Sequence, residues 1–104
     1  MNDIGQRLAA LSARFAEQAG DTAAAIAAAL EREDRQELAS LCHSLSGRAG
    51  MFGHPAIGDA ARCVEIAIDE GRPEGEVAEL ARDLLRQLAS LGHGPAPLAN
   101  DTVE

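Results

Sequence analysis

The spacing of apolar residues constrains the fold most, because they recur every three or four positions along five segments of the chain. This spacing is typical of one buried face of an α-helix. Aromatic residues make up only 2% of the chain, whereas alanine and leucine are frequent, so helix formers are abundant and sheet formers scarce. We therefore expect an all-α protein.

Glycine, proline and aspartate separate the five segments. Asp34 with Glu37 resembles a capping box, and Pro55 and Pro73 suit the first turn of a helix. Short connections favour antiparallel neighbours, which predicts an up-down antiparallel four-helix bundle with an additional N-terminal helix packed across one end. The predicted helices run from about residue 3 to Ala19, Asp21 to Glu33, Asp34 to Phe52, Pro55 to Gly71, and Pro73 to Gly92.

The length of 104 residues predicts one domain with one core. We assign residues 1–92 to the helical bundle. Residues 93–104 have no periodic apolar face and contain Pro95 and Pro97, so we expect a disordered C-terminal tail.

Charge and hydropathy exclude several classes of partner. The formal net charge is -8, and the basic residues are scattered arginines, which disfavours binding to nucleic acid or an anionic membrane. No secretion signal or membrane-spanning run is evident, so we expect a cytoplasmic monomer. Cys42 and Cys63 are then expected to be free thiols.

The third predicted helix contains the most informative pattern. Its apolar stripe points about 150° away from His43, so His43 faces solvent from the middle of the helix. The stripe consists of Leu38, Leu41, Cys42, Leu45, Ala49 and Phe52. The neighbours of His43 on the solvent side, which we call the small-residue clearing, are Ala39, Ser40, Ser46, Gly47 and Gly50.

Two glycines inside a helix lower its stability, at about 0.5–1 kcal/mol each relative to alanine. That loss is understandable if a bulky partner must approach the imidazole of His43. A neutral imidazole is available near pH 7, which suits a nucleophile that accepts a group and releases it again.

The stretch from His43 to Gly53 resembles the signature of histidine-containing phosphotransfer (HPt) domains. In that signature, His-x-Leu-Lys-Gly is followed, after four further residues, by an apolar residue and a glycine. His43, Leu45, Gly47, Phe52 and Gly53 match. The resemblance implies a phosphorelay protein in which His43 is the phosphoacceptor and the clearing admits and docks the partner. The implied partners are response-regulator receiver domains, a hybrid histidine kinase, or both.

The resemblance implies no cofactor on this chain, with Mg²⁺ expected on the receiver. The sequence has no Walker-type or kinase-type glycine loop, so we expect no ATP site and no autonomous kinase activity. One position departs from the family, because Ser46 stands where lysine is common and the chain has no lysine. Arg48 and Arg62 are the candidates to compensate the charge of the phosphate.

The other histidines and the cysteines have simpler structural interpretations. His54 fits a helix boundary, where it would cap, and His93 fits a helix end. Zinc could in principle be bound by Cys42, His43, His54 and Cys63. However, the side chains of adjacent helical residues point about 100° apart, and the chain has no Cys-x-x-Cys spacing. We therefore expect no metal site. The competing function is a non-catalytic helical interaction or adaptor protein.

Overall fold

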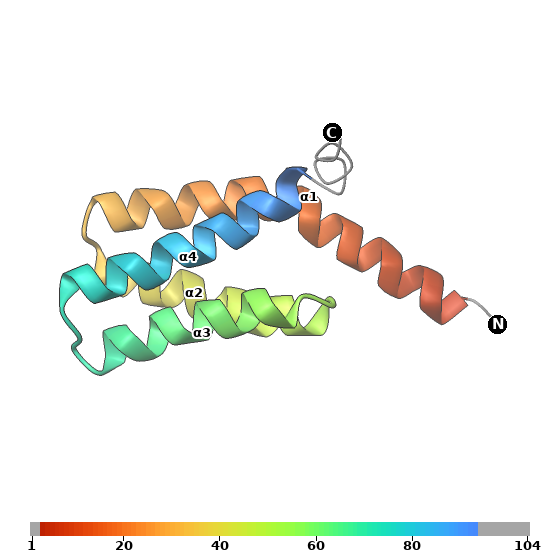
Figure 1. The fold of residues 1–104 in the computed structure, drawn as a ribbon. Helices are drawn as coiled ribbons and strands as arrows, with labels where there is room; N and C mark the ends of the chain where they lie inside the picture. The colour runs from red at the N-terminus through yellow and green to blue at the C-terminus, as the bar shows by residue number, and fades with distance from the viewer. Residues whose placement is uncertain (1–2, 94–104) are drawn as a thin grey trace, which may run out of the picture.

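The computed structural model describes residues 3–93, which form four α-helices and no strand (Figure 1). The helices are α1 (Asp3–Glu31), α2 (Arg35–Met51), α3 (Pro55–Asp69) and α4 (Glu74–His93). The all-helical prediction is confirmed. Within residues 3–93, no helix has the length and apolar content that crossing a bilayer requires.

The predicted break at Gly20 and Asp21 is wrong, because both residues lie inside the continuous helix α1. Glycine can adopt helical angles, and its cost of about 0.5–1 kcal/mol relative to alanine is too small to interrupt a helix that continues through the alanine-rich residues 23–29. The separate N-terminal helix therefore does not exist as such. Figure 1 instead shows α1 changing direction along its length, with its N-terminal part extending beyond the other helices.

The turns between the helices follow the local sequence signals. The Asp34 side chain caps α2 by accepting a hydrogen bond from the backbone N–H of Glu37 at 3.1 Å, as predicted. Pro55 begins α3, also as predicted. Glu33 occupies the left-handed region with φ 57° in the turn between α1 and α2. The predicted helix ends differ from the observed ones by one or two residues.

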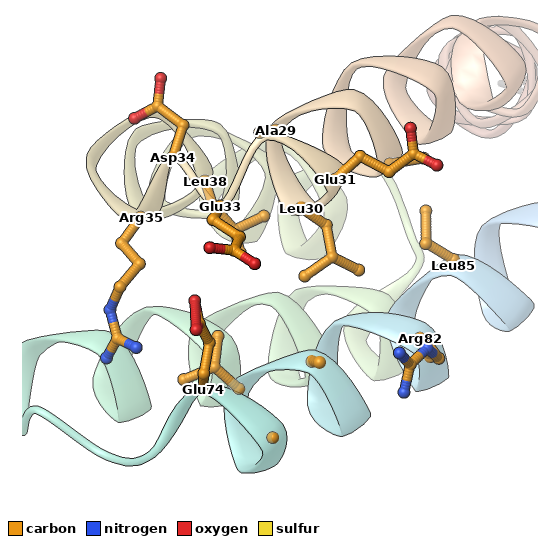
Figure 2. A pocket seen from close by; sticks show the side chains of 14 residues that line it. Ala29, Leu30, Glu31, Glu33, Asp34, Arg35, Leu38, Glu74, Arg82 and Leu85 are labelled. Carbon is orange, nitrogen blue, oxygen red and sulfur yellow. The ribbon is translucent and has the colours of Figure 1, made fainter.

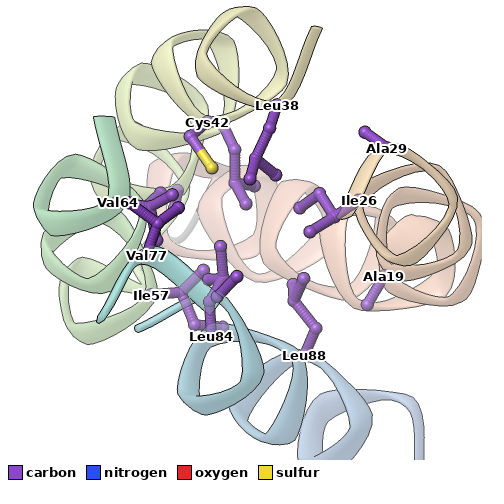
Figure 3. Close-up of a cluster of buried hydrophobic side chains, with 14 of the residues drawn as sticks. Ala19, Ile26, Ala29, Leu38, Cys42, Ile57, Val64, Val77, Leu84 and Leu88 are labelled. Atoms are coloured by element: carbon purple, nitrogen blue, oxygen red, sulfur yellow. The ribbon is translucent and has the colours of Figure 1, made fainter. Parts of the chain in front are cut away.

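The core lies along the bundle axis and draws side chains from all four helices (Figure 3). Four members of the predicted stripe of α2 are fully buried, and the other two, Leu41 and Phe52, are half-buried against the core. Helix α2 packs mainly on α3, and α1 mainly on α4. Residues 94–104 of the predicted tail lie outside the described residues, and α4 extends to His93.

Candidate functional site

His43 lies near the middle of α2, and 77% of its side chain is exposed. The core-facing residues next to it, Cys42 and Leu45, are completely buried. The rigid attachment of α2 to the core therefore fixes the backbone of His43 while its imidazole projects into solvent.

Glu65 of α3 holds the ring of His43 in place. The Nδ1 atom of His43 lies 2.9 Å from Oε2 of Glu65, whose side chain is 24% exposed. An ionised carboxylate only accepts hydrogen bonds, so Nδ1 carries the proton in this contact. In the neutral ring, Nε2 then keeps its lone pair and can act as an acceptor or a nucleophile.

The sequence analysis missed Glu65, which is 22 positions away from His43. No local motif joins the two residues, because their contact depends on how α2 and α3 align. The sequence pointed to Glu65 only through the predicted antiparallel pairing of these two helices, which brings the middle of one helix beside the middle of the other.

The small-residue clearing is open on the surface of α2. Ser40, Gly47 and Gly50 are exposed, whereas Ala39 and Ser46 are half-buried. A Cβ atom added at Gly47 or Gly50 would have no neighbour within 4 Å. A second molecule can therefore approach His43 from this side without displacing any side chain of the chain itself.

Ser46 does not present its hydroxyl to the imidazole. Its Oγ donates a hydrogen bond to the backbone carbonyl of His43 at 3.0 Å. Side chains of serine commonly make this bond within helices. The position where the family has lysine is thus occupied by a group that already has a partner on its own helix.

The two candidate arginines lie on different helices. Arg48 is half-buried on α2, about 140° around the helix from His43, and Arg62 is exposed on α3, one turn before Glu65. Among residues 3–93, neither side chain forms an ion pair or a hydrogen bond, either with His43 or with another residue.

Gly58, which the sequence analysis also did not single out, lies beneath the site where α2 and α3 approach each other. It is buried, and an added Cβ atom would lie 3.1 Å from the carbonyl oxygen of Ser46 and 3.4 Å from the backbone nitrogen of Gly50. A larger residue at this position would press against the backbone of α2. The close contact lies in the same α2–α3 interface that the His43–Glu65 contact bridges.

The remaining histidine and cysteine candidates have other environments. His54 forms no capping hydrogen bond, contrary to expectation, because its Nε2 pairs with Oγ of Ser12 at 3.0 Å and its ring stacks on Phe15. The side chain of His93 is not among those described. No group of three metal-ligating side chains occurs within the described part of the chain.

Both cysteines are free thiols, as predicted. Burial, and to a smaller extent the nearby Glu65, raises the pKa of the Cys42 thiol to about 12. Cys63 is exposed on α3. Cys42 is therefore part of the core, not of the reactive surface.

A family model described as the Hpt domain matches residues 10–92 of the chain. The matched region includes α2 and α3 entirely and nearly all of α4, and therefore His43, Glu65 and the small-residue clearing. No curated protein and no solved structure matches the chain.

Proposed function

The chain belongs to the Hpt domain family, and we propose that it transfers phosphoryl groups in two-component signalling through a phosphohistidine on His43. The observation that carries this proposal is the exposed imidazole whose Nδ1 is held by Glu65, beside an unobstructed helix surface.

The proposed reaction is an in-line exchange between two carriers. The Nε2 lone pair of His43 attacks the phosphorus of an aspartyl phosphate on a receiver domain, an N–P bond forms, and the P–O bond to the aspartate breaks. The aspartate leaves as a carboxylate. The return step reverses these changes when a receiver aspartate attacks the phosphohistidine, and any Mg²⁺ used belongs to the receiver.

Glu65 contributes to both directions of this exchange. A ring phosphorylated at Nε2 and protonated at Nδ1 carries a positive charge, which the carboxylate 2.9 Å from Nδ1 stabilises. The same hydrogen bond orients the ring before attack, so less orientational freedom is lost on reaching the transition state.

The donor and acceptor partners are receiver domains, alone or within a hybrid histidine kinase. They dock over the small-residue clearing, where Ala39 and Ser40 lie before His43 and Gly47 and Gly50 lie after it. Arg48 and Arg62 remain the candidates to offset the phosphate charge when a partner is bound.

Phosphotransfer from a purified phosphorylated receiver tests the proposal. The wild-type chain and the control variant His54→Gln should become labelled, and His43→Gln should not. Acid lability and alkali stability of the label would identify an N–P bond. Labelling of His43→Gln would refute the assignment, and an unlabelled wild-type chain would favour the passive adaptor.

Gly47→Gln tests the role of the clearing separately. Glutamine is a good helix former and the position is exposed, so circular dichroism should remain native-like. The added side chain stands beside His43, so transfer from a receiver should slow by at least about tenfold, because displacement of about 1 Å is enough to lower a rate strongly. Phosphoramidate, a small donor, should be affected less. An equal effect on both donors would contradict docking at this surface.

A further inference from the structure

A cavity of about 490 Å³ opens at the end of the bundle where the α1–α2 turn meets the start of α4 (Figure 2). Its apolar wall includes Leu30, Leu38 and Leu85. Leu30 and Leu85 are only half-buried, so they remain accessible to a ligand. This volume lies within the range of about 300–1,000 Å³ that is typical of binding pockets.

The cavity exists because small residues line this end of the core. Ala27 of α1 and Gly75 and Ala78 of α4 border it, and none of them fills the space between the two helices. At the opposite end of the bundle, aromatic side chains close the structure, since Phe15 packs edge to face on Phe52 with 6.2 Å between ring centroids.

Carboxylates dominate the mouth of the cavity. Figure 2 shows the side chains of Glu33 and Glu74 pointing toward each other from the α1–α2 turn and from the start of α4. Both are exposed, and neither pairs with a cation among residues 3–93. Two like charges that face each other repel, and a cation placed between them would relieve that repulsion.

The basic residues of the rim leave this acidic pair uncompensated. Arg35 donates a hydrogen bond to the backbone carbonyl of Arg72 at 2.9 Å, which directs its guanidinium toward the α3–α4 turn. Arg82 lies farther along α4, on the side of Leu85, away from the two facing carboxylates (Figure 2).

We propose that this cavity is a second docking site, which binds a basic amphipathic helical segment of a partner protein. A lysine or arginine of that segment lies between Glu33 and Glu74, and an apolar side chain one helical turn away enters the cavity against Leu30 and Leu85. One helical turn places two such side chains on the same face of the segment. The aliphatic stem of the basic residue adds contact with the apolar wall.

The second site goes beyond the proposed phosphotransfer and is separate from His43. Asp34 at the cavity and His43 are nine residues apart in sequence, which corresponds to about 13 Å along the axis of α2. One partner can therefore occupy the cavity while a receiver domain reaches His43. Such a tether raises the effective concentration of the partner at the phosphoacceptor.

A synthetic helical peptide with leucine and arginine one turn apart is the probe, titrated into the full-length chain and followed by amide NMR shifts. We expect saturable shifts at Leu30, Glu74 and Ala78. Two comparison peptides should bind at least about tenfold more weakly, one with serine for leucine and one with glutamine for arginine. Equal binding of the serine peptide, or of spermidine alone, would overturn the proposal in favour of nonspecific attraction to an acidic protein.

Matched variants locate the binding to the cavity. Ala78→Leu fills the space, whereas Ala24→Leu makes the same change at an exposed position of α1 outside it. The double variant Glu33→Gln with Glu74→Gln removes the facing charges without adding bulk, and Glu79→Gln is its control. Ala78→Leu and the double variant should each weaken peptide binding about tenfold, and the two controls, Ala24→Leu and Glu79→Gln, should not. If all four variants bind the peptide equally, the proposal is wrong.

Labelling of His43 by phosphoramidate separates this proposal from the phosphotransfer function. The cavity variants should be labelled at the wild-type rate, because the cavity does not include His43. Loss of peptide binding with intact labelling supports the second site. Absence of labelling in the wild-type chain would refute the proposed function and leave the peptide result unaffected.

Discussion

Replacement of Gly58 by alanine tests the packing that brings His43 and Glu65 together. The new Cβ would lie 3.1 Å from the carbonyl oxygen of Ser46, 3.4 Å from the nitrogen of Gly50 and 3.6 Å from Cβ of Ala49. The first two atoms belong to the backbone of α2 and cannot rotate away. Helices α2 and α3 must therefore separate by a few tenths of an ångström.

Two opposing effects determine the size of the change. Alanine in place of glycine stabilises a helix interior by about 0.5–1 kcal/mol. Overpacking of a well-packed contact costs about 1–3 kcal/mol. Because the contact is with backbone, we expect the cost to exceed the gain, with a net destabilisation of about 1 kcal/mol.

Gly47→Ala is the matched control, since no atom lies within 4 Å of its added Cβ. The control should be stabilised by about 0.5–1 kcal/mol, so the two variants should shift the thermal midpoint in opposite directions. For a domain of this size, 1 kcal/mol corresponds to about 4–8 °C. Urea denaturation with a common m-value gives the same comparison as free energies of unfolding.

The same variant has a functional consequence. Separation of α2 and α3 lengthens the contact between His43 Nδ1 and Glu65, so Gly58→Ala should slow phosphotransfer while Gly47→Ala leaves the hydrogen bond intact. If Gly58→Ala is stabilised as much as Gly47→Ala, the two helices are not in close contact at this point. Close packing at Gly58 would then not account for the contact between His43 and Glu65.

Two substitutions test the site, and one labelling experiment tests the core behind it. Glu65→Gln should slow transfer about fivefold and lower the Nδ1–H tautomer population in ¹⁵N NMR of His43, and unchanged tautomer signals would contradict the orienting role. Ser46→Lys should favour the phosphorylated form by about 0.3–1 kcal/mol at low salt, and an equilibrium insensitive to the new cation would exclude a charge effect. At pH 8, iodoacetamide should modify Cys63 but not Cys42, whose pKa is raised to about 12 by burial, until denaturant is added; equal rates in the native protein would refute this assignment.

The sequence was sufficient to predict the helical fold and the exposure of His43 because both depend on local periodicity. The apolar spacing on α2 determines which residues face the core, and His43 lies on the other side of that helix. The cap at Asp34 was predictable for the same reason, since its partner Glu37 is three residues away. These features require no knowledge of how the helices pack together.

The features that the sequence did not predict depend on packing between helices or on the balance of small energies. Glu65 and Gly58 have their roles only through the alignment of α3 on α2, which no single helical pattern specifies. Gly20 was misread as a break because a glycine that costs about 0.5–1 kcal/mol is tolerated when the helix continues on both sides. The cavity near Glu74 likewise arises from the meeting of two chain segments that are distant in sequence.

The departure at Ser46 bears on how the phosphoryl group is held. Its hydroxyl is bonded to the carbonyl of His43, so the residue supplies neither a charge nor a free donor to the phosphate. In the proposed function Glu65 stabilises a positive charge on the phosphorylated ring instead, through its contact with Nδ1. A protonated ring is the better leaving group, whereas a phosphate without a nearby cation is less stabilised on the histidine. In the proposed phosphotransfer the two effects on the stability of the phosphohistidine therefore oppose each other, because the Glu65 contact stabilises the ring and the missing cation leaves the phosphate charge unbalanced.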